Sequence, residues 1–119
     1  MNPWLYPVVW MILIFIGSSQ QMSGDESFPI FSDKIVHFIE FGILSFLFFY
    51  AMVRKAVFEK RWNVFLCAVF FTLLYSISDE VHQIYVPTRD ASVFDLIADF
   101  CGAVCFALTA KHIFRNKYN

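Results

Sequence analysis

Ionisable side chains recur at helical spacing inside stretches of this sequence that are otherwise strongly apolar. Residues three or four positions apart lie on one face of a helix. Three lines of this kind are present: Asp33, His37 and Glu40; Ser76, Glu80 and Gln83; and Asp95, Asp99 and Gly102. Carboxylates and an imidazole are the groups that transfer protons, accept hydrogen bonds from sugars or amides, and ligate metal ions. The pattern therefore indicates a polar site.

Such residues are expensive within a membrane. A charge at the centre of a membrane helix costs roughly 2.5–3.5 kcal/mol on insertion scales, so several together are retained only where they pair, reach water or serve a function. Structural roles stay open for some: Asp33 and Asp95 can cap helices, and Lys34 can extend its charge to the headgroups. Glu40 and Asp99 lie about two turns, roughly 10 Å, below the helix ends. They are too deep to cap, so burial must either keep each carboxyl protonated or give it a partner, for which His37 and Arg89 are the candidates.

Four apolar runs must position these lines. The chain has 119 residues, of which 59% are hydrophobic and 16 are Phe, against roughly 45–50% apolar residues in soluble domains. The runs cover 3–18, 34–53, 62–84 and 92–110, each near the roughly 17–25 residues that span a bilayer. We therefore predict an all-α fold: a polytopic membrane protein, residues 1–119 forming one four-transmembrane-helix bundle. A cleaved signal peptide is the alternative for the first run, but no Lys or Arg precedes its apolar stretch.

Local signals predict where these helices end and how they approach one another. Pro87 lacks a backbone donor and disfavours helix at the preceding residue, so the third helix should end by about Tyr85. Ser92 has the spacing of a capping box with the acid three residues later and should start the fourth helix. Gly42 and Ser45 would allow another helix to approach the second one closely.

The basic residues are distributed unevenly between the connections. Those between the second and third runs and after the fourth are Arg54, Lys55, Lys60, Arg61, Lys111, Arg115 and Lys117, whereas the other two connections hold Lys34 and Arg89. Short loops rich in Lys and Arg stay in the cytoplasm. Both termini should therefore be cytoplasmic, and the polar lines should lie towards the outer leaflet.

The ordered motifs resemble those of the VanZ-like family of small bacterial membrane proteins. They are Asp33-Lys34-x-x-His37-Phe38, Ser76-x-x-x-Glu80-x-x-Gln83, Pro87-x-Arg89 and Asp95-x-x-x-Asp99-x-x-Gly102, over about residues 33–105. The resemblance implies a multi-pass protein of the bacterial cytoplasmic membrane. The family's namesake is associated with low-level resistance to the lipoglycopeptide antibiotic teicoplanin. This sequence departs from the family pattern at Phe41, where tyrosine is frequent, at Thr88, where glycine is common, and at Asp99, where asparagine often occurs.

The function we favour is that of a cell-envelope protein whose outer-leaflet cleft binds a polar headgroup. The partners would be membrane lipid and a lipid-linked cell-wall precursor or a lipoglycopeptide; no nucleic acid is expected. The residues expected to bind are Asp33, Lys34, His37, Glu80, Gln83, Arg89, Asp95 and Asp99. Arg89 and Lys34 would contact phosphate, and the acids and the amide would accept hydrogen bonds from sugar or amide groups.

The main alternative is a membrane-embedded enzyme that acts on lipid or cell-wall intermediates by acid–base or metal-assisted chemistry. Its candidate catalytic residues are His37, Glu40, Glu80, Asp95 and Asp99. Neither a nucleophile with an obvious activating base nor a His-Glu-x-x-His motif is present. We therefore predict no metal site and name no cofactor, although such a pocket could hold Mg²⁺ or Zn²⁺.

A proton or ion pathway is the third class of function. It ranks last because the cytoplasmic halves of the runs, such as 46–51 and 103–108, do not continue the polar lines. Asp79 and His82 lie off the main line of the third helix. We expect those two side chains to be exposed at the membrane interface.

Overall fold

The protein is all-α in its computed structural model, which describes residues 1–19, 30–87 and 92–116, with only the backbone at 30–33. The helices are α1 (Leu5–Ser18), α2 (Ile30–Arg54), α3 (Arg61–Ile84) and α4 (Val93–Ile113). This confirms the predicted fold class. The α2, α3 and α4 helices are each long and apolar enough to cross a membrane. The α1 helix has 14 residues, about 21 Å at 1.5 Å per residue against a hydrocarbon core of roughly 30 Å, so a fourth crossing stays a prediction.

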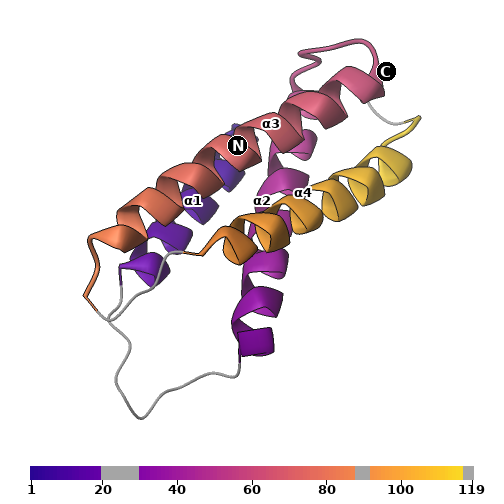
Figure 1. The fold of residues 1–119 in the computed structure, drawn as a ribbon. Helices are drawn as coiled ribbons and strands as arrows, with labels where there is room; N and C mark the ends of the chain where they lie inside the picture. The colour runs from indigo at the N-terminus through magenta and orange to yellow at the C-terminus, as the bar shows by residue number, and fades with distance from the viewer. Residues whose placement is uncertain (20–29, 88–91, 117–119) are drawn as a thin grey trace.

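Successive helices run in opposite directions, which brings four helix ends together (Figure 1). These are the carboxyl ends of α1 and α3 and the amino ends of α2 and α4; we call this side of the bundle the site end. The α2 and α3 helices each pack against all the others, while α1 and α4 do not touch each other in the described part of the chain. The basic turn between Arg54 and Arg61 lies at the opposite end (Figure 1).

Two of the predicted helix ends are formed by the residues that the sequence indicated. The α3 helix stops at Ile84, with Tyr85 as its C-cap, two residues before Pro87. Ser92 is the N-cap of α4, and its hydroxyl accepts a hydrogen bond from the backbone N–H of Phe94 at 3.1 Å. One backbone N–H of the first turn of α4 is thereby satisfied, and Ser92 lies beside the last turns of α3, where its own N–H binds Glu80.

Small residues allow α2 and α4 to approach closely. A Cβ atom on Gly102 would lie 2.0 Å from the backbone oxygen of Phe38, and one on Gly42 would lie 2.4 Å from an aromatic ring of α4. Ser45 Oγ donates a hydrogen bond to the carbonyl of Ala103 at 2.9 Å. Close backbone packing of this kind stabilises helix pairs whose outer faces meet lipid. It also sets the register between the polar residues of α2 and those of α4.

The α1 helix is fixed to the bundle by two side-chain hydrogen bonds to backbone carbonyls. Trp10 Nε1 donates to the oxygen of Glu40 at 2.8 Å, and the Tyr75 hydroxyl donates to the oxygen of Met11 at 2.6 Å. These bonds join α1 to both α2 and α3. As a result, α1 covers one face of each helix.

Candidate functional site

Buried polar side chains from α2, α3 and α4 meet at the site end. The residues of this cluster, which we call the polar site, are Lys34, His37, Ser76, Glu80, Asp95 and Asp99. Apart from Lys34, which is partly exposed, all are less than a tenth exposed. An apolar protein interior rarely contains so many polar groups unless they are paired or functional.

Asp99 is the centre of the polar site because its carboxylate joins three helices. The side chain is completely buried. Its Oδ1 lies 2.9 Å from Nδ1 of His37 on α2, and its Oδ2 accepts a hydrogen bond from Ser76 Oγ on α3 at 2.5 Å. Hydrogen bonds to an ionised acceptor are stronger than neutral ones. Asp99 therefore has the partners that its depth requires.

Asp95 holds the outer part of the polar site. Its Oδ1 pairs with the ammonium group of Lys34, and its Oδ2 lies 3.9 Å from Nε2 of His37. The His37 ring thus has Asp99 at one nitrogen and Asp95 near the other. It also lies nearly parallel to the ring of Phe41, with 6.1 Å between the centroids. The hydrogen bond with Asp99 orients the imidazole, which a proton-transferring or metal-binding histidine requires.

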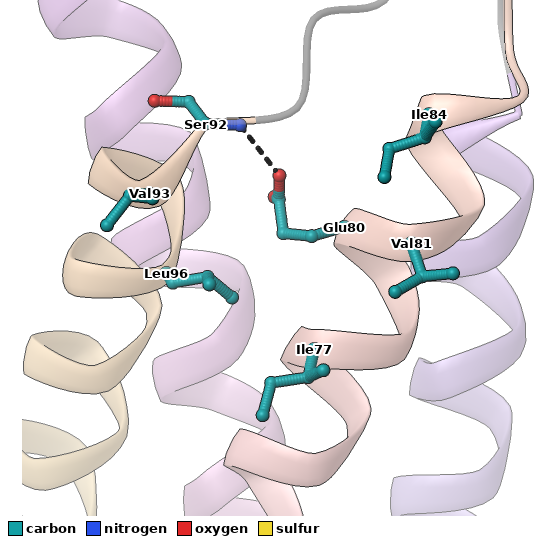
Figure 2. A pocket seen from close by; sticks show the side chains of 7 residues that line it. All are labelled: Ile77, Glu80, Val81, Ile84, Ser92, Val93 and Leu96. Carbon is teal, nitrogen blue, oxygen red and sulfur yellow. Dashed lines mark hydrogen bonds between the residues drawn. The ribbon is translucent and has the colours of Figure 1, made fainter.

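Glu80 has one satisfied oxygen and one unsatisfied oxygen. Its Oε2 accepts a hydrogen bond from the backbone N–H of Ser92 at 3.1 Å (Figure 2). Its Oε1 is buried and has no hydrogen-bond partner in the described part of the chain. One ligand atom each of Glu80, His37 and Asp99 lie within 4.8 Å of one another. A buried polar atom left unpaired costs about 1–3 kcal/mol, so the orphaned oxygen points to an additional partner.

The residues flanking the polar site on α3 correct one expectation. Asp79 is 4% exposed and accepts a hydrogen bond from Gln83 Nε2 at 3.2 Å. His82 is half-buried, shares a hydrogen bond of 2.9 Å with Ser19 Oγ, and stacks on Phe15 with 4.6 Å between ring centroids. The expectation that Asp79 and His82 are exposed is wrong, because α1 packs over this face of α3.

A pocket of about 220 Å³ opens between α3 and α4 beside Glu80 (Figure 2). Its lining residues are Ile77, Glu80, Val81, Ile84, Ser92, Val93 and Leu96. Most of them are aliphatic, and several are at least half exposed on the outer surface of the bundle. Glu80 extends from α3 towards the first turn of α4 (Figure 2). This α3–α4 pocket therefore connects the lipid-facing surface with one carboxylate of the polar site.

The structure brings most of the predicted site residues together, and their roles in binding or catalysis stay predictions. Those that it brings together are Lys34, His37, Glu80, Asp95 and Asp99. Gln83 is buried beside them on α3, where it bonds to Asp79. Glu40 is half-buried one turn further along α2, where its carbonyl accepts the bond from α1. The side chain of Asp33 and all of Arg89 lie outside the described residues. Ser76 was not among the predicted site residues, although it shares the helical line of Glu80.

Acidic side chains outnumber basic ones among the described residues of the polar site. Glu80, Asp95 and Asp99 face Lys34 and His37, and the carboxylate of Asp79 lies one residue along α3 from Glu80. Like charges a few ångströms apart repel strongly where water is scarce. The site is therefore suited to a cation, to protons or to hydrogen-bond donors.

Comparison with known proteins identifies the family. The family model described as VanZ/LLP1 matches residues 3–115, almost the whole chain. No curated protein and no solved structure matches. Together with the three long apolar helices, the match fits a multi-pass membrane protein of the cell envelope linked to glycopeptide resistance. The chain belongs to the VanZ/LLP1 family.

Proposed function

We propose that this protein binds an amphiphile with a lipid tail and a sugar- or peptide-bearing head, at the outer leaflet of the bacterial cytoplasmic membrane. A lipid-linked cell-wall precursor and a lipoglycopeptide such as teicoplanin share this chemistry. The observation that carries the proposal is the α3–α4 pocket, whose aliphatic walls lead from the lipid-facing surface to Glu80. One ligand could therefore contact the aliphatic walls of the pocket with its tail and Glu80 with its head.

The volume of the α3–α4 pocket suits part of the hydrocarbon tail of an amphiphile. Its volume of about 220 Å³ is smaller than the roughly 300–1,000 Å³ typical of sites that enclose a whole small molecule. A segment of an acyl or isoprenoid chain could therefore lie between α3 and α4 while the remainder stays in the bilayer. Such a chain would bury the exposed side chains of Ile77, Ile84 and Val93, which are between 51% and 70% exposed.

The polar site supplies groups that would recognise the head. Its carboxylates accept hydrogen bonds from hydroxyl and amide donors, which sugars and peptides have in abundance. Lys34 reaches the same place, with 26% of its side chain exposed beside Asp95, and could contact a phosphate. Arg89 follows Pro87 in the connection between α3 and α4, and its planar guanidinium would bind phosphate in a bidentate manner.

The distribution of basic residues supports the outer-leaflet location. Arg54, Lys55, Lys60 and Arg61 flank or form the turn at the end of the bundle remote from the polar site. Basic connections favour the cytoplasm. We infer that both termini are cytoplasmic, which would leave the polar site near the extracytoplasmic headgroups.

Binding measured in lipid nanodiscs tests this function. The probes are teicoplanin, the same glycopeptide without its acyl chain, and a purified lipid-linked wall precursor. We expect one of the two tailed probes to bind and the probe without a tail to bind at least about tenfold more weakly, a difference of about 1.4 kcal/mol. If neither tailed probe binds, or if removing the acyl chain changes nothing, the proposal is wrong.

A pair of neighbouring substitutions on α4 locates the tail. Leu96→Trp would fill the α3–α4 pocket, whereas Ile97→Trp adds the same bulk one residue away, at a side chain that is 52% exposed and does not line the pocket. We expect Leu96→Trp to weaken binding by about tenfold or more and Ile97→Trp to leave binding unchanged. Equal effects would exclude the pocket as the place of the tail.

A second candidate function is acid–base catalysis, which the hydrogen-bonded chain from Ser76 through Asp99 to His37 favours. Asp99 would hold the ring so that Nε2, near Asp95, transfers a proton. Incubation with a labelled lipid-linked precursor would distinguish this function from binding alone. Catalysis requires a product that His37→Gln abolishes while binding persists.

A further inference from the structure

We propose that His37, Glu80 and Asp99 hold a divalent transition-metal ion of the zinc or manganese class at the centre of the polar site. This inference replaces the sequence-based prediction of no metal site. It goes beyond the proposed function, because the ion could bind whether or not an amphiphile does. Three observations carry it: the arrangement of three donor atoms, the orphaned oxygen of Glu80 and the balance of charge.

The three donors come from three helices and lie close together. One ligand atom each of His37, Glu80 and Asp99 lie within 4.8 Å of one another, and the three residues are 4%, 6% and 0% exposed. Around a tetrahedral zinc ion with bonds of about 2.0–2.2 Å, ligand atoms lie roughly 3.3 Å apart. Atoms up to 4.8 Å apart would have to approach one another by up to about 1.5 Å to bind the ion, and rotation about the staggered torsions of Glu80 permits a shift of this kind.

The free oxygen of Glu80 is the second observation and is independent of the spacing. Oε2 is held by the backbone of Ser92, which leaves Oε1 buried without a partner in the described part of the chain. Unsatisfied buried acceptors are rare in native proteins, and a bound ion is one of the partners that explains them. An ion between Glu80 and His37 would satisfy this oxygen.

The charge balance favours a cation at this point. Among the residues that the structure describes here, the acids Glu80, Asp95 and Asp99 outnumber the basic Lys34 when the imidazole of His37 is neutral, and a neutral imidazole is the form that binds metals. Ser76 donates to Asp99 at 2.5 Å, the kind of outer hydrogen bond that orients a ligating carboxylate. Mixed imidazole and carboxylate donors suit zinc or manganese, whereas calcium and magnesium prefer oxygen alone.

The first test uses the purified wild-type protein in nanodiscs that contain no amphiphilic ligand. After treatment with a chelator, Mn²⁺ is titrated and followed by electron paramagnetic resonance, and Zn²⁺ is counted by elemental analysis. We expect one ion per chain, with a nitrogen hyperfine coupling to Mn²⁺ from His37. Binding of less than one ion per chain, or an ion without nitrogen coupling, would overturn the proposal. Because neither readout requires a lipid or an antibiotic, its failure is distinguishable from failure of the proposed function.

A matched pair of substitutions on α3 separates coordination from general charge. Glu80→Gln removes a proposed ligand, whereas Asp79→Asn removes the adjacent carboxylate, which is similarly buried and lies outside the trio. We expect Glu80→Gln to raise the Kd for Mn²⁺ by about tenfold or more and Asp79→Asn to raise it by less than about threefold. Equal losses would mean that the ion is attracted by charge alone and would refute the site. If Glu80→Gln does not fold, the nitrogen coupling of the wild type decides.

Discussion

Replacing Asp99 by Leu removes a carboxylate that joins α2, α3 and α4. The two bonds lost are those to His37 Nδ1 at 2.9 Å and Ser76 Oγ at 2.5 Å. Because Asp99 is completely buried, water cannot replace it as a partner of either group. A buried donor left without its acceptor costs about 1–3 kcal/mol, which gives about 2–6 kcal/mol for the two.

The loss should be smaller within a membrane. Interhelical hydrogen bonds in membrane proteins average about 0.6 kcal/mol and reach about 1.7, because the unfolded chain also finds partners. The leucine side chain gains little in return, since lipid is as apolar as the bundle interior. We therefore expect Asp99→Leu to lower the free energy of unfolding by about 1–3 kcal/mol, which is the sum of two such bonds.

The matched control is Asp99→Asn, which keeps the shape and one acceptor oxygen. Its amide can donate to a neutral His37 while the remaining oxygen accepts from Ser76, so the expected loss is below about 1 kcal/mol. Steric trapping in bicelles measures the unfolding free energy of both variants directly. If Asp99→Leu is as stable as Asp99→Asn, or more stable than the wild type, Asp99 does not hold the helices together as described.

Three further predictions concern packing, recognition and topology. Gly102→Ala should destabilise the bundle by about 1–3 kcal/mol, because its Cβ would lie 2.0 Å from the Phe38 oxygen, whereas Gly17→Ala, with nothing within 4 Å, should be neutral or slightly stabilising in the same unfolding assay. Arg89→Lys and Arg89→Ala should both abolish amphiphile binding in nanodiscs while the melting temperature stays close to wild type; an unfolded Arg89→Ala would instead mark a structural role. A cysteine introduced at Val57 should react with a membrane-impermeant reagent only after the cells are opened; labelling in intact cells would mean that the topology is the reverse of the one inferred.

Much of the fold follows from local features of the sequence. Apolar runs of membrane-spanning length predict the three long helices, and Pro87 and Ser92 predict where α3 ends and α4 begins. Helical spacing also predicts that His37 and Asp99 lie on inward faces, because exposing both to lipid would be costly. These inferences succeed because backbone geometry and the cost of desolvation act within one helix.

The missed features depend on which helices pack together. Tyr75, Asp79 and His82 share one face of α3, and the structure covers that face with α1. Spacing along α3 cannot reveal this cover, since it depends on contacts with a separate and shorter helix. For the same reason, helical spacing predicts which face of α3 carries Glu80 but does not predict the hydrogen bond from the backbone of Ser92. That bond forms only when α3 and α4 pack side by side.

Photo-crosslinking in bacterial membranes tests the central claim most directly, namely that an amphiphile lies in the α3–α4 pocket with its head at the polar site. A benzophenone amino acid is placed either at Leu96, inside the pocket, or at Ile97, outside it, and the adducts are identified by mass spectrometry. Position 96 should capture a tailed molecule with a sugar- or peptide-bearing head, and Glu80→Gln should abolish that adduct. The same bulk phospholipid at both positions, unaffected by Glu80→Gln, would contradict the account.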